Sequence, residues 1–247
     1  MIAKIDCLLK ELSKRYQAQS LFDPIELVDY EIVQSHDRLP AWWGANGNFL
    51  VRPRGAANGI PHIQLHPGHE KCSNFILICN GEHDYGVLVW GDGGLMYVAR
   101  EASIAGANIA LGSGCVYCGP YVRHTARLNL NCRNGGAIFL RRDVLIASDV
   151  IIQTDDCHTL FSVAERKRLN PYGGLIDIDD HVWIGQESMV MGNSKIARDS
   201  IIGARSFVRG GEFPSNVVLA GSPARVVSSG VNWDFRDLPP AVAPTSS

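Results

Sequence analysis

The chain has 247 residues, of which 46% are hydrophobic and 19% charged, so it is long enough to bury a large core. Its net charge of -2 at pH 7 excludes the strongly basic surface typical of nucleic-acid-binding proteins. The longest apolar runs, such as residues 75–79, are much shorter than the about 20 residues that span a bilayer. We therefore expect neither a nucleic-acid partner nor a membrane partner.

The first residues and the cysteines indicate the compartment. Lys4, Asp6 and Lys10 interrupt the apolar residues at the start of the chain, unlike the uninterrupted apolar segment of a secretory signal. The 7 cysteines are odd in number and irregularly spaced, which argues against a disulfide framework. We expect a reducing, cytoplasmic location.

The first 94 residues are predicted to form an N-terminal helix followed by short strands. Apolar residues recur at spacings of three and four over residues 1–19, which predicts an amphipathic helix packed on the main body. Prolines disfavour long helices between residues 20 and 94. The apolar runs Phe75–Cys79 and Gly86–Trp90 predict strands there. At the other end, residues 228–247 are expected to form a C-terminal tail.

A six-residue repeat in the second half of the chain decides the expected fold. An aliphatic residue returns every six positions, and between Ile184 and Ile202 a serine follows four positions after each of them. The period is interrupted between Leu128 and Ile138, where residues 131–136 are expected to form a turn or bulge. The repeating aliphatic residues are Val98, Ile104, Ala110, Val116, Val122, Leu128, Val144, Val150, Ile178, Ile184, Val190, Ile196, Ile202 and Val208, and the clearest serines are Ser188, Ser194, Ser200 and Ser206.

This period suits a short strand followed by a corner. Three such units close a triangular coil of about eighteen residues, which stacks on the next coil. Side chains alternate across a strand, so the aliphatic residue and the residue two places before it both point inward. The serine is small because it lies at a corner. We predict a mainly β chain with a parallel β-helix over residues 95–227.

The hexads Ile184–Met189 and Ile202–Phe207 resemble those of the bacterial hexapeptide-repeat acyltransferases, which form left-handed parallel β-helices. Asp155–His158 is similar to the segment that carries the catalytic histidine of that family before an excursion loop. Residues 180–185 resemble its tryptophan-bearing coil. Residues 220–226 are similar to the loop that closes the helix beside coenzyme A, although many relatives have Asn for Ser222 and Lys for Arg225.

The resemblance is greatest to the polysaccharide and capsule O-acetyltransferases, because Asn170-Pro171 and Val231–Trp233 also fit that branch. It implies an O-acetyltransferase that uses acetyl-CoA as donor, without a metal, and acts on a sugar hydroxyl of a surface polysaccharide or its precursor. It also implies a homotrimer with the donor bound between adjacent subunits.

Acetyl transfer from a thioester to an alcohol needs a base for the hydroxyl proton, and histidine suits that role at neutral pH. His158 is the candidate base, because it ends a pair of hexads just where the repeat breaks into the excursion. Asp155, Asp156 or a backbone carbonyl could orient its ring. Trp183 is expected to pack against the pantetheine arm with its N–H available as a donor, whereas His181 is interpreted as a surface residue.

Further residues are expected to bind the two substrates. A small residue lets a narrow cofactor lie close to the backbone, and arginine binds phosphate through paired donors. The positive cluster of the excursion is expected to attract an anionic acceptor. The candidate donor contacts are Gly203, Ala204, Arg209 and Arg225, and the candidate acceptor contacts are His124, Arg166 and Arg168.

Several alternatives remain open from the sequence. The acceptor could instead be serine, an antibiotic or an amino-sugar. A carbonic-anhydrase-like β-helix needs three histidines around a metal, and the histidine spacing between residues 124 and 181 does not fit one. Prolines at positions 61 and 67 break any helical metal site at His62, His66 and His69. Cys115 and Cys118 lack a second pair at zinc spacing, and regular outward threonine ladders, typical of an ice-binding β-helix, are absent from the sequence.

Overall fold

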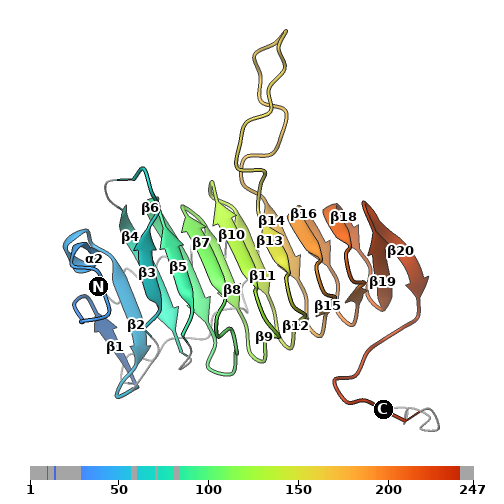
Figure 1. The fold of residues 1–247 in the computed structure, drawn as a ribbon, viewed down its shortest axis with the longest axis horizontal. Helices are drawn as coiled ribbons and strands as arrows, with labels where there is room; N and C mark the ends of the chain where they lie inside the picture. The colour runs from blue at the N-terminus through green and yellow to red at the C-terminus, as the bar shows by residue number, and fades with distance from the viewer. Residues whose placement is uncertain are drawn as a thin grey trace.

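The computed structural model describes residues 10, 14, 29–56, 60–69, 72–80 and 84–239, and the regular secondary structure of these residues is almost wholly short strands (Figure 1). The helix predicted over residues 1–19 lies outside the described residues, apart from Lys10 and Lys14, which are helical. In the described part of the chain, no helix is long and apolar enough to cross a lipid bilayer.

The strands stack as the coils of a left-handed parallel β-helix of about seven turns. Each strand pairs in parallel with its equivalent in the next coil, which produces three faces. Face 1 consists of β2 (Phe49–Pro53), β4 (Cys72–Cys79), β6 (Gly91–Val98), β8 (Cys115–Cys118), β11 (Ala137–Leu140) and β14 (Leu175–Ile178). Face 2 consists of β3 (His62–Leu65), β5 (Gly86–Val89), β7 (Asn108–Gly112), β10 (Asn129–Arg133) and β13 (Ile151–Gln153). Face 3 consists of β9 (Arg123–His124), β12 (Leu145–Ile146), β15 (Trp183–Ile184), β17 (Ile201–Ile202) and β19 (Val217–Gly221).

Two long strands cross the corner between faces 2 and 1. β16 (Met189–Ile196) pairs with β13 through its first residues and with β14 through its last, and β18 (Phe207–Phe213) pairs along both halves of β16. Antiparallel strands lie at the two ends of the stack: β1 (Tyr30–Val33) on β2, and β20 (Ala224–Ser229) on β19. The one-turn helix α2 (Trp42–Ala45) buries Trp43 completely. These end elements cover sheet edges that could otherwise pair with another chain.

The serine positions lie inside the coils, as the repeat predicts. Ser188, Ser194, Ser200 and Ser206 are all buried, and the aliphatic residues from Ile178 to Val208 are buried with them. The hydroxyl groups hydrogen-bond to corner backbone: Ser188 Oγ donates to Gly203 O (2.9 Å) and Ser194 Oγ to Met191 O (2.7 Å). A small hydroxyl residue at each corner therefore satisfies backbone groups in the core.

The predicted phase of the repeat is wrong in the coil before the excursion. The register pairs Ile146 with Ile184 and Ile152 with Val190, so these two isoleucines occupy the main aliphatic positions. Val144 and Val150 lie two residues earlier and are also buried. The prediction followed Ser148, four positions after Val144, but Ser148 is only half-buried and does not occupy a closed corner like the later serines.

The phase is also wrong in the first coils, where Ala110 is half-exposed and β7 buries Ile109 and Leu111 instead. The coils there are about four residues longer than the eighteen of a regular hexapeptide coil. The expected turn over residues 131–136 is likewise shorter than predicted. β10 runs to Arg133, and the turn is made by Asn134 and Gly135, whose φ angles are 57° and 71°.

The parallel ladder begins before residue 95. β4 and β5 coincide with the strands predicted at Phe75–Cys79 and Gly86–Trp90, and each pairs in parallel with the following strand of its face. At the other end, β20 extends past residue 227, and residues 220–226 form the end of the β19–β20 hairpin, with its turn at Ser222 and Pro223.

The predicted excursion is present between β13 and β14, where residues 154–174 leave the coil as a long arm (Figure 1). Leu169 N donates to Leu160 O and Ser162 N donates to Lys167 O, both at 2.8 Å. The arm is therefore a narrow antiparallel pair of segments with a turn at its tip.

Candidate active site

Asp155 closes the base of the excursion. Its side chain is almost completely buried, with the residue only 3% exposed. Oδ1 accepts a hydrogen bond from Cys157 N (2.9 Å), and Oδ2 accepts one from Asn134 Nδ2 (2.6 Å) and one from Gly173 N (3.1 Å). Asp155 thus joins the outgoing and returning segments of the arm to the preceding coil.

Asn170 forms a second clamp one step further along the arm. It is only 7% exposed, and its Oδ1 accepts a hydrogen bond from Leu160 N (2.9 Å). Its Nδ2 donates to His158 O (2.7 Å) and to Asp156 Oδ2 (3.3 Å). Asn170 therefore fixes the backbone of the candidate base. The sequence indicated Asn170 only through the family resemblance. The contacts of Asn170 cross the arm and follow no periodic pattern, so residue spacing could not predict them.

Arg168 stabilises the same base of the excursion. We call this base, residues 155–160 and 168–173, the neck. The guanidinium of Arg168 donates to Asn170 O (2.9 Å), Thr159 Oγ1 (2.8 Å) and Pro171 O (3.1 Å), and lies 5.1 Å from the centre of the Tyr172 ring. The sequence predicts an acceptor contact for Arg168, and the structure shows a guanidinium engaged in holding the neck.

His158 lies exposed at the start of the excursion. In the part of the chain that the structure describes, its imidazole makes no hydrogen bond, and both neighbouring carboxylates have other partners. Asp155 holds the neck, and Asp156 Oδ2 lies 3.6 Å from Arg209 Nη2. The ring of His158 is therefore open to solvent on a backbone that is held in place.

The strand register pairs Arg209 of β18 with Met191 of β16, and Met191 with Gln153 of β13. This row on face 2 leads straight to the base of the excursion. A guanidinium predicted to bind coenzyme A phosphates thus lies beside the segment that carries His158, although the two are far apart in the sequence.

Trp183 lies on face 3 and is 39% exposed. Its register partners are Leu145 and Ile201, and Ile201 pairs with Val218, so the row is apolar from Leu145 to Val218. Beside it, residues 203 and 220 form a row of small residues. A Cβ at Gly203 would lie 3.4 Å from the Ala220 Cβ, an ordinary van der Waals contact, so the two positions are in contact between neighbouring coils.

The structure does not bring His158 and Trp183 together within one chain. The excursion leaves the corner between faces 2 and 1, whereas Trp183 lies on face 3 in the other sheet (Figure 1). A site that uses both residues must therefore combine face 3 with the corner that carries the excursion.

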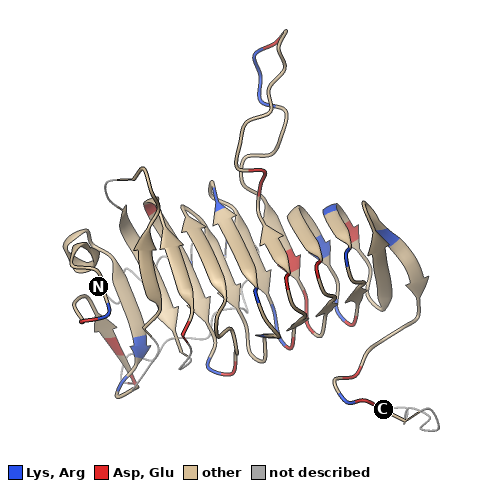
Figure 2. Cartoon of the chain, in the orientation of Figure 1, with Lys and Arg blue, Asp and Glu red and all other residues tan. Residues whose placement is uncertain are grey.

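The other candidate residues are distributed along the helix. His124 in β9 places Nε2 2.9 Å from Ala105 O, and its Nδ1 is buried with no hydrogen-bond partner among the described residues. Arg225 in β20 is exposed and donates to Ala224 O (2.8 Å). Ala204 is exposed at the corner after β17. Arg166 is exposed at the tip of the excursion, where Figure 2 shows charged residues far from the coils.

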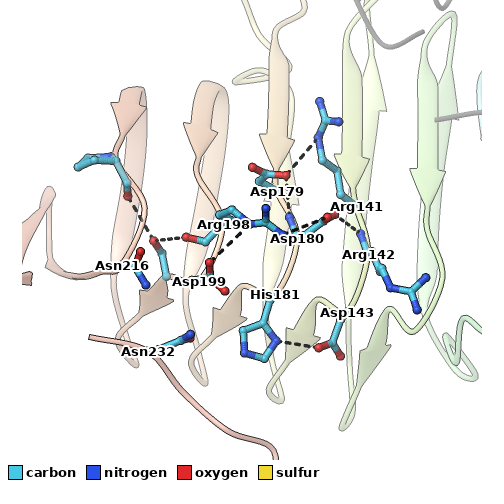
Figure 3. Close-up of polar contacts among 12 residues, drawn as sticks. Arg141, Arg142, Asp143, Asp179, Asp180, His181, Arg198, Asp199, Asn216 and Asn232 are labelled. Carbon is cyan, nitrogen blue, oxygen red and sulfur yellow. Dashed lines mark hydrogen bonds and ion pairs between the residues drawn. The ribbon is translucent and has the colours of Figure 1, made fainter. Parts of the chain in front are cut away.

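His181 is more than a surface residue. Figure 3 shows its ring directed at Asp143, with Nδ1 2.7 Å from Oδ2, beside a ladder of arginine and aspartate residues at the corner between faces 1 and 3. In that ladder Arg141 Nε donates to Asp177 Oδ1 (2.7 Å) and Arg142 N donates to Asp180 Oδ1 (3.0 Å). These contacts join consecutive coils.

Comparison with known proteins gives sequence relatives and a structural neighbour. No protein-family profile matches the chain. A galactoside O-acetyltransferase of Lactococcus lactis is 31% identical over 135 residues, which cover 55% of this chain and 59% of that protein. A polysialic acid O-acetyltransferase of Escherichia coli is 27% identical over 100 residues, which cover 40% of this chain and 32% of that protein.

Among solved structures, a polysialic-acid-specific acetyltransferase superposes with a TM-score of 0.65 at 24% identity, over 72% of this chain and 74% of that chain. The resemblance to the hexapeptide-repeat O-acetyltransferases is confirmed. It holds for the repeat region in sequence and for most of the chain in fold. The matched segments span 59% or less of these two curated relatives.

Proposed function

We propose that this protein transfers an acetyl group from acetyl-CoA to a sugar hydroxyl of a surface polysaccharide or its precursor. The observation that carries the proposal is the exposed imidazole of His158, on a backbone clamped by Asn170 at the mouth of a long excursion. The similarity to acetyltransferases named for a galactoside and for polysialic acid supports a carbohydrate acceptor.

The proposed reaction is a direct transfer with His158 as general base. The imidazole removes the proton of the acceptor hydroxyl while the hydroxyl oxygen attacks the thioester carbonyl carbon. The resulting tetrahedral oxyanion collapses, the carbon–sulfur bond breaks, and the leaving thiolate takes a proton from the imidazolium. The products are a sugar acetate ester and free coenzyme A, and no acyl group becomes attached to the protein.

The proposed donor site follows the rows of small and apolar residues on face 3. Trp183 offers an exposed indole for the pantetheine arm, and the backbone at Gly203 and Ala204 allows a narrow chain to lie close. Arg209 and Arg225 are the proposed phosphate contacts, and both guanidinium groups are on exposed residues.

A homotrimer would complete this site. Because His158 and Trp183 lie on different parts of one chain, we propose that His158 of one subunit faces Trp183 of its neighbour across a trimer interface. A cytoplasmic location is part of the proposal, since coenzyme A is a cytoplasmic donor and the six described cysteines are free.

The acceptor is proposed to be an anionic saccharide. Arg166 and Lys167 at the tip of the excursion are exposed and would attract it, with His124 as a further acceptor contact. Arg168 would act there through the neck, because its donors are already engaged.

The test is release of free thiol from acetyl-CoA, measured against a panel of anionic saccharides, neutral saccharides, serine and amino-sugars. We expect turnover with saccharides and an acetyl ester in the product by mass spectrometry. Turnover with serine or an amino-sugar alone would contradict the proposed acceptor. No thiol release with any acceptor would contradict the proposed chemistry.

A further inference from the structure

The chain does not end at the cap of the helix but turns back across face 3. We call residues 230–236 the strap. It starts where Val231 N donates to Asn216 O and Asn216 Nδ2 donates to Val231 O, both at 3.2 Å. Figure 1 shows the segment after β20 running back past the coils. The strap thus lies over the same face that carries Trp183.

The strap is held on face 3 mainly by one histidine. The rings of His181 and Trp233 stack with centroids 4.1 Å apart and an angle of 7° between their planes. Trp233 Nε1 donates to His181 O (2.9 Å), and His181 Nε2 lies 3.1 Å from Trp233 O.

The contacts of the His181 ring fit the doubly protonated form. Nδ1 faces the carboxylate of Asp143 at 2.7 Å and Nε2 faces the carbonyl oxygen of Trp233 at 3.1 Å. Both partners only accept hydrogen bonds, and a neutral imidazole has only one N–H. Both contacts are therefore satisfied together only by an imidazolium, which has two donors.

The charged groups around His181 come from several elements. Asp143, which precedes β12, is shared with Arg123 of β9, whose Nη2 lies 2.6 Å from Oδ1. The guanidinium of Arg123 also lies 4.4 Å from the centre of the Phe235 ring in the strap. The carboxylate of Asp143 therefore has a cationic partner whether or not His181 is charged.

The remaining charges near His181 are engaged with one another. In the strap, Asp234 pairs with Arg236 at 2.7 Å; these hydrogen bonds, with a smaller contribution from His181, lower the pKa of Asp234 to about 2. On the coils, Asp180 accepts from the Arg142 backbone and lies 3.8 Å from Arg198. Apart from His181, the charged groups of this cluster are thus held by partners of opposite charge.

We propose that protonated His181 latches the strap onto face 3, and that the latched Trp233 forms one wall of the donor site beside Trp183. The two indoles lie 6.3 Å apart, tilted by 49°, and Trp183 is exposed on the side of the proposed donor row. The wall assignment rests on the proposed function, whereas the latch depends only on the contacts of the strap.

The contact between His181 and the strap should weaken as the pH rises. While the ring is doubly protonated, its two N–H groups donate to both Asp143 and the Trp233 carbonyl. Loss of one proton at higher pH removes one of these two donors, so the strap loses a hydrogen bond. We expect the strap to loosen with rising pH and donor affinity to fall by about two- to tenfold, the effect of one hydrogen bond.

The test uses the full chain labelled with 5-fluorotryptophan, which gives one ¹⁹F resonance for each of the 5 tryptophans. Broadening of each resonance by a soluble paramagnetic agent measures its exposure at a series of pH values. We expect the Trp233 resonance to become more exposed as the pH rises, while buried Trp43 stays protected. His181→Gln should leave Trp233 exposed at every pH.

Two further variants keep the result interpretable. The matched control is His66→Gln, because His66 lies beside Trp90 with ring centroids 5.5 Å apart, so only Trp90 should respond. If His181→Gln fails to fold, Asp143→Asn replaces it and should move release of the strap to a lower pH. A Trp233 exposure that is independent of pH in the wild type, or that still changes with pH in His181→Gln, overturns the latch.

The donor wall is tested separately by calorimetric titration with coenzyme A. We expect the dissociation constant to rise with pH in the wild type and to stay constant in His181→Gln. A moving strap with an affinity independent of pH overturns the wall assignment. If coenzyme A binds at no pH, the proposed function fails, and the ¹⁹F result still decides whether the latch exists.

Discussion

Asn170 Nδ2 donates a hydrogen bond of 2.7 Å to the carbonyl oxygen of His158, from the other side of the excursion. The only polar side chain that touches the His158 backbone in the described structure is therefore itself buried and bonded to Leu160 N. This relationship makes Asn170 a positioning residue for the proposed base.

Asn170→Ala should lower kcat by about 10- to 100-fold, because misplacement of a catalytic group by about 1 Å can cost that much. The KM for acetyl-CoA should hardly change. Thr159→Val is the matched control, since it removes a contact of Arg168 in the same neck but leaves the His158 carbonyl bonded. Steady-state kinetics at saturating donor measures both variants. A kcat equal to that of the control would show that Asn170 does not position the base.

Ser200→Leu should destabilise the protein by about 1–3 kcal/mol, because a larger side chain overpacks a closed corner. Ser200 is buried, and its Oγ lies 3.2 Å from Pro214 O. Arg198→Leu serves as control, because its exposed ion pairs contribute about 0–1 kcal/mol. Denaturant unfolding of both variants gives the two free energies. Equal losses would contradict the inward register of the serines.

The tip of the excursion should affect binding of a charged acceptor, and the neck should affect turnover. The double variant Arg166→Gln, Lys167→Gln should raise KM for an anionic saccharide and flatten its salt dependence, since exposed charges are screened at ordinary salt. KM for a neutral saccharide should stay the same. Arg168→Gln should lower kcat instead, because its donors to Asn170 O and Pro171 O hold the neck. If only KM for acetyl-CoA changes in the double variant, the tip serves the donor.

The buried cysteines should resist thiol reagents in the native protein. Burial raises the pKa of Cys79, Cys118 and Cys132 to about 12, so almost no thiolate forms at pH 8. Among the described cysteines, only half-exposed Cys157 should react before unfolding. Mass spectrometry after a short treatment with iodoacetamide tests this. Modification of Cys118 in the folded protein would contradict the packing of β8.

The period of the sequence predicted which residues fill the coils, but it could not always assign their places. Ser188 and Ser200 mark the corners because serine differs from the aliphatic residues beside it. Val144 and Ile146 are both apolar and both buried, so only the pairing of Ile146 with Ile184 distinguishes them. The predicted phase failed in this coil because Ser148, four positions after Val144, does not occupy a closed corner.

The candidate site was predictable only where chemistry coincides with a break in the pattern. His158 marks the start of the excursion, and Trp183 keeps its place on an outward position of a strand. The partners of these residues could not be predicted from spacing. Asn170 acts across an arm, and Trp233 reaches His181 from 52 residues away through a chain reversal that no repeat encodes.

The central claim is that His158 is the general base of a saccharide O-acetyltransferase. The most direct measurement is the turnover of His158→Ala in the thiol-release assay with the best saccharide acceptor, with melting temperature and assembly mass measured alongside. We expect turnover to fall by about 10²- to 10⁴-fold, the usual contribution of a general base, with folding and assembly unchanged. Turnover close to that of the wild type would contradict the account.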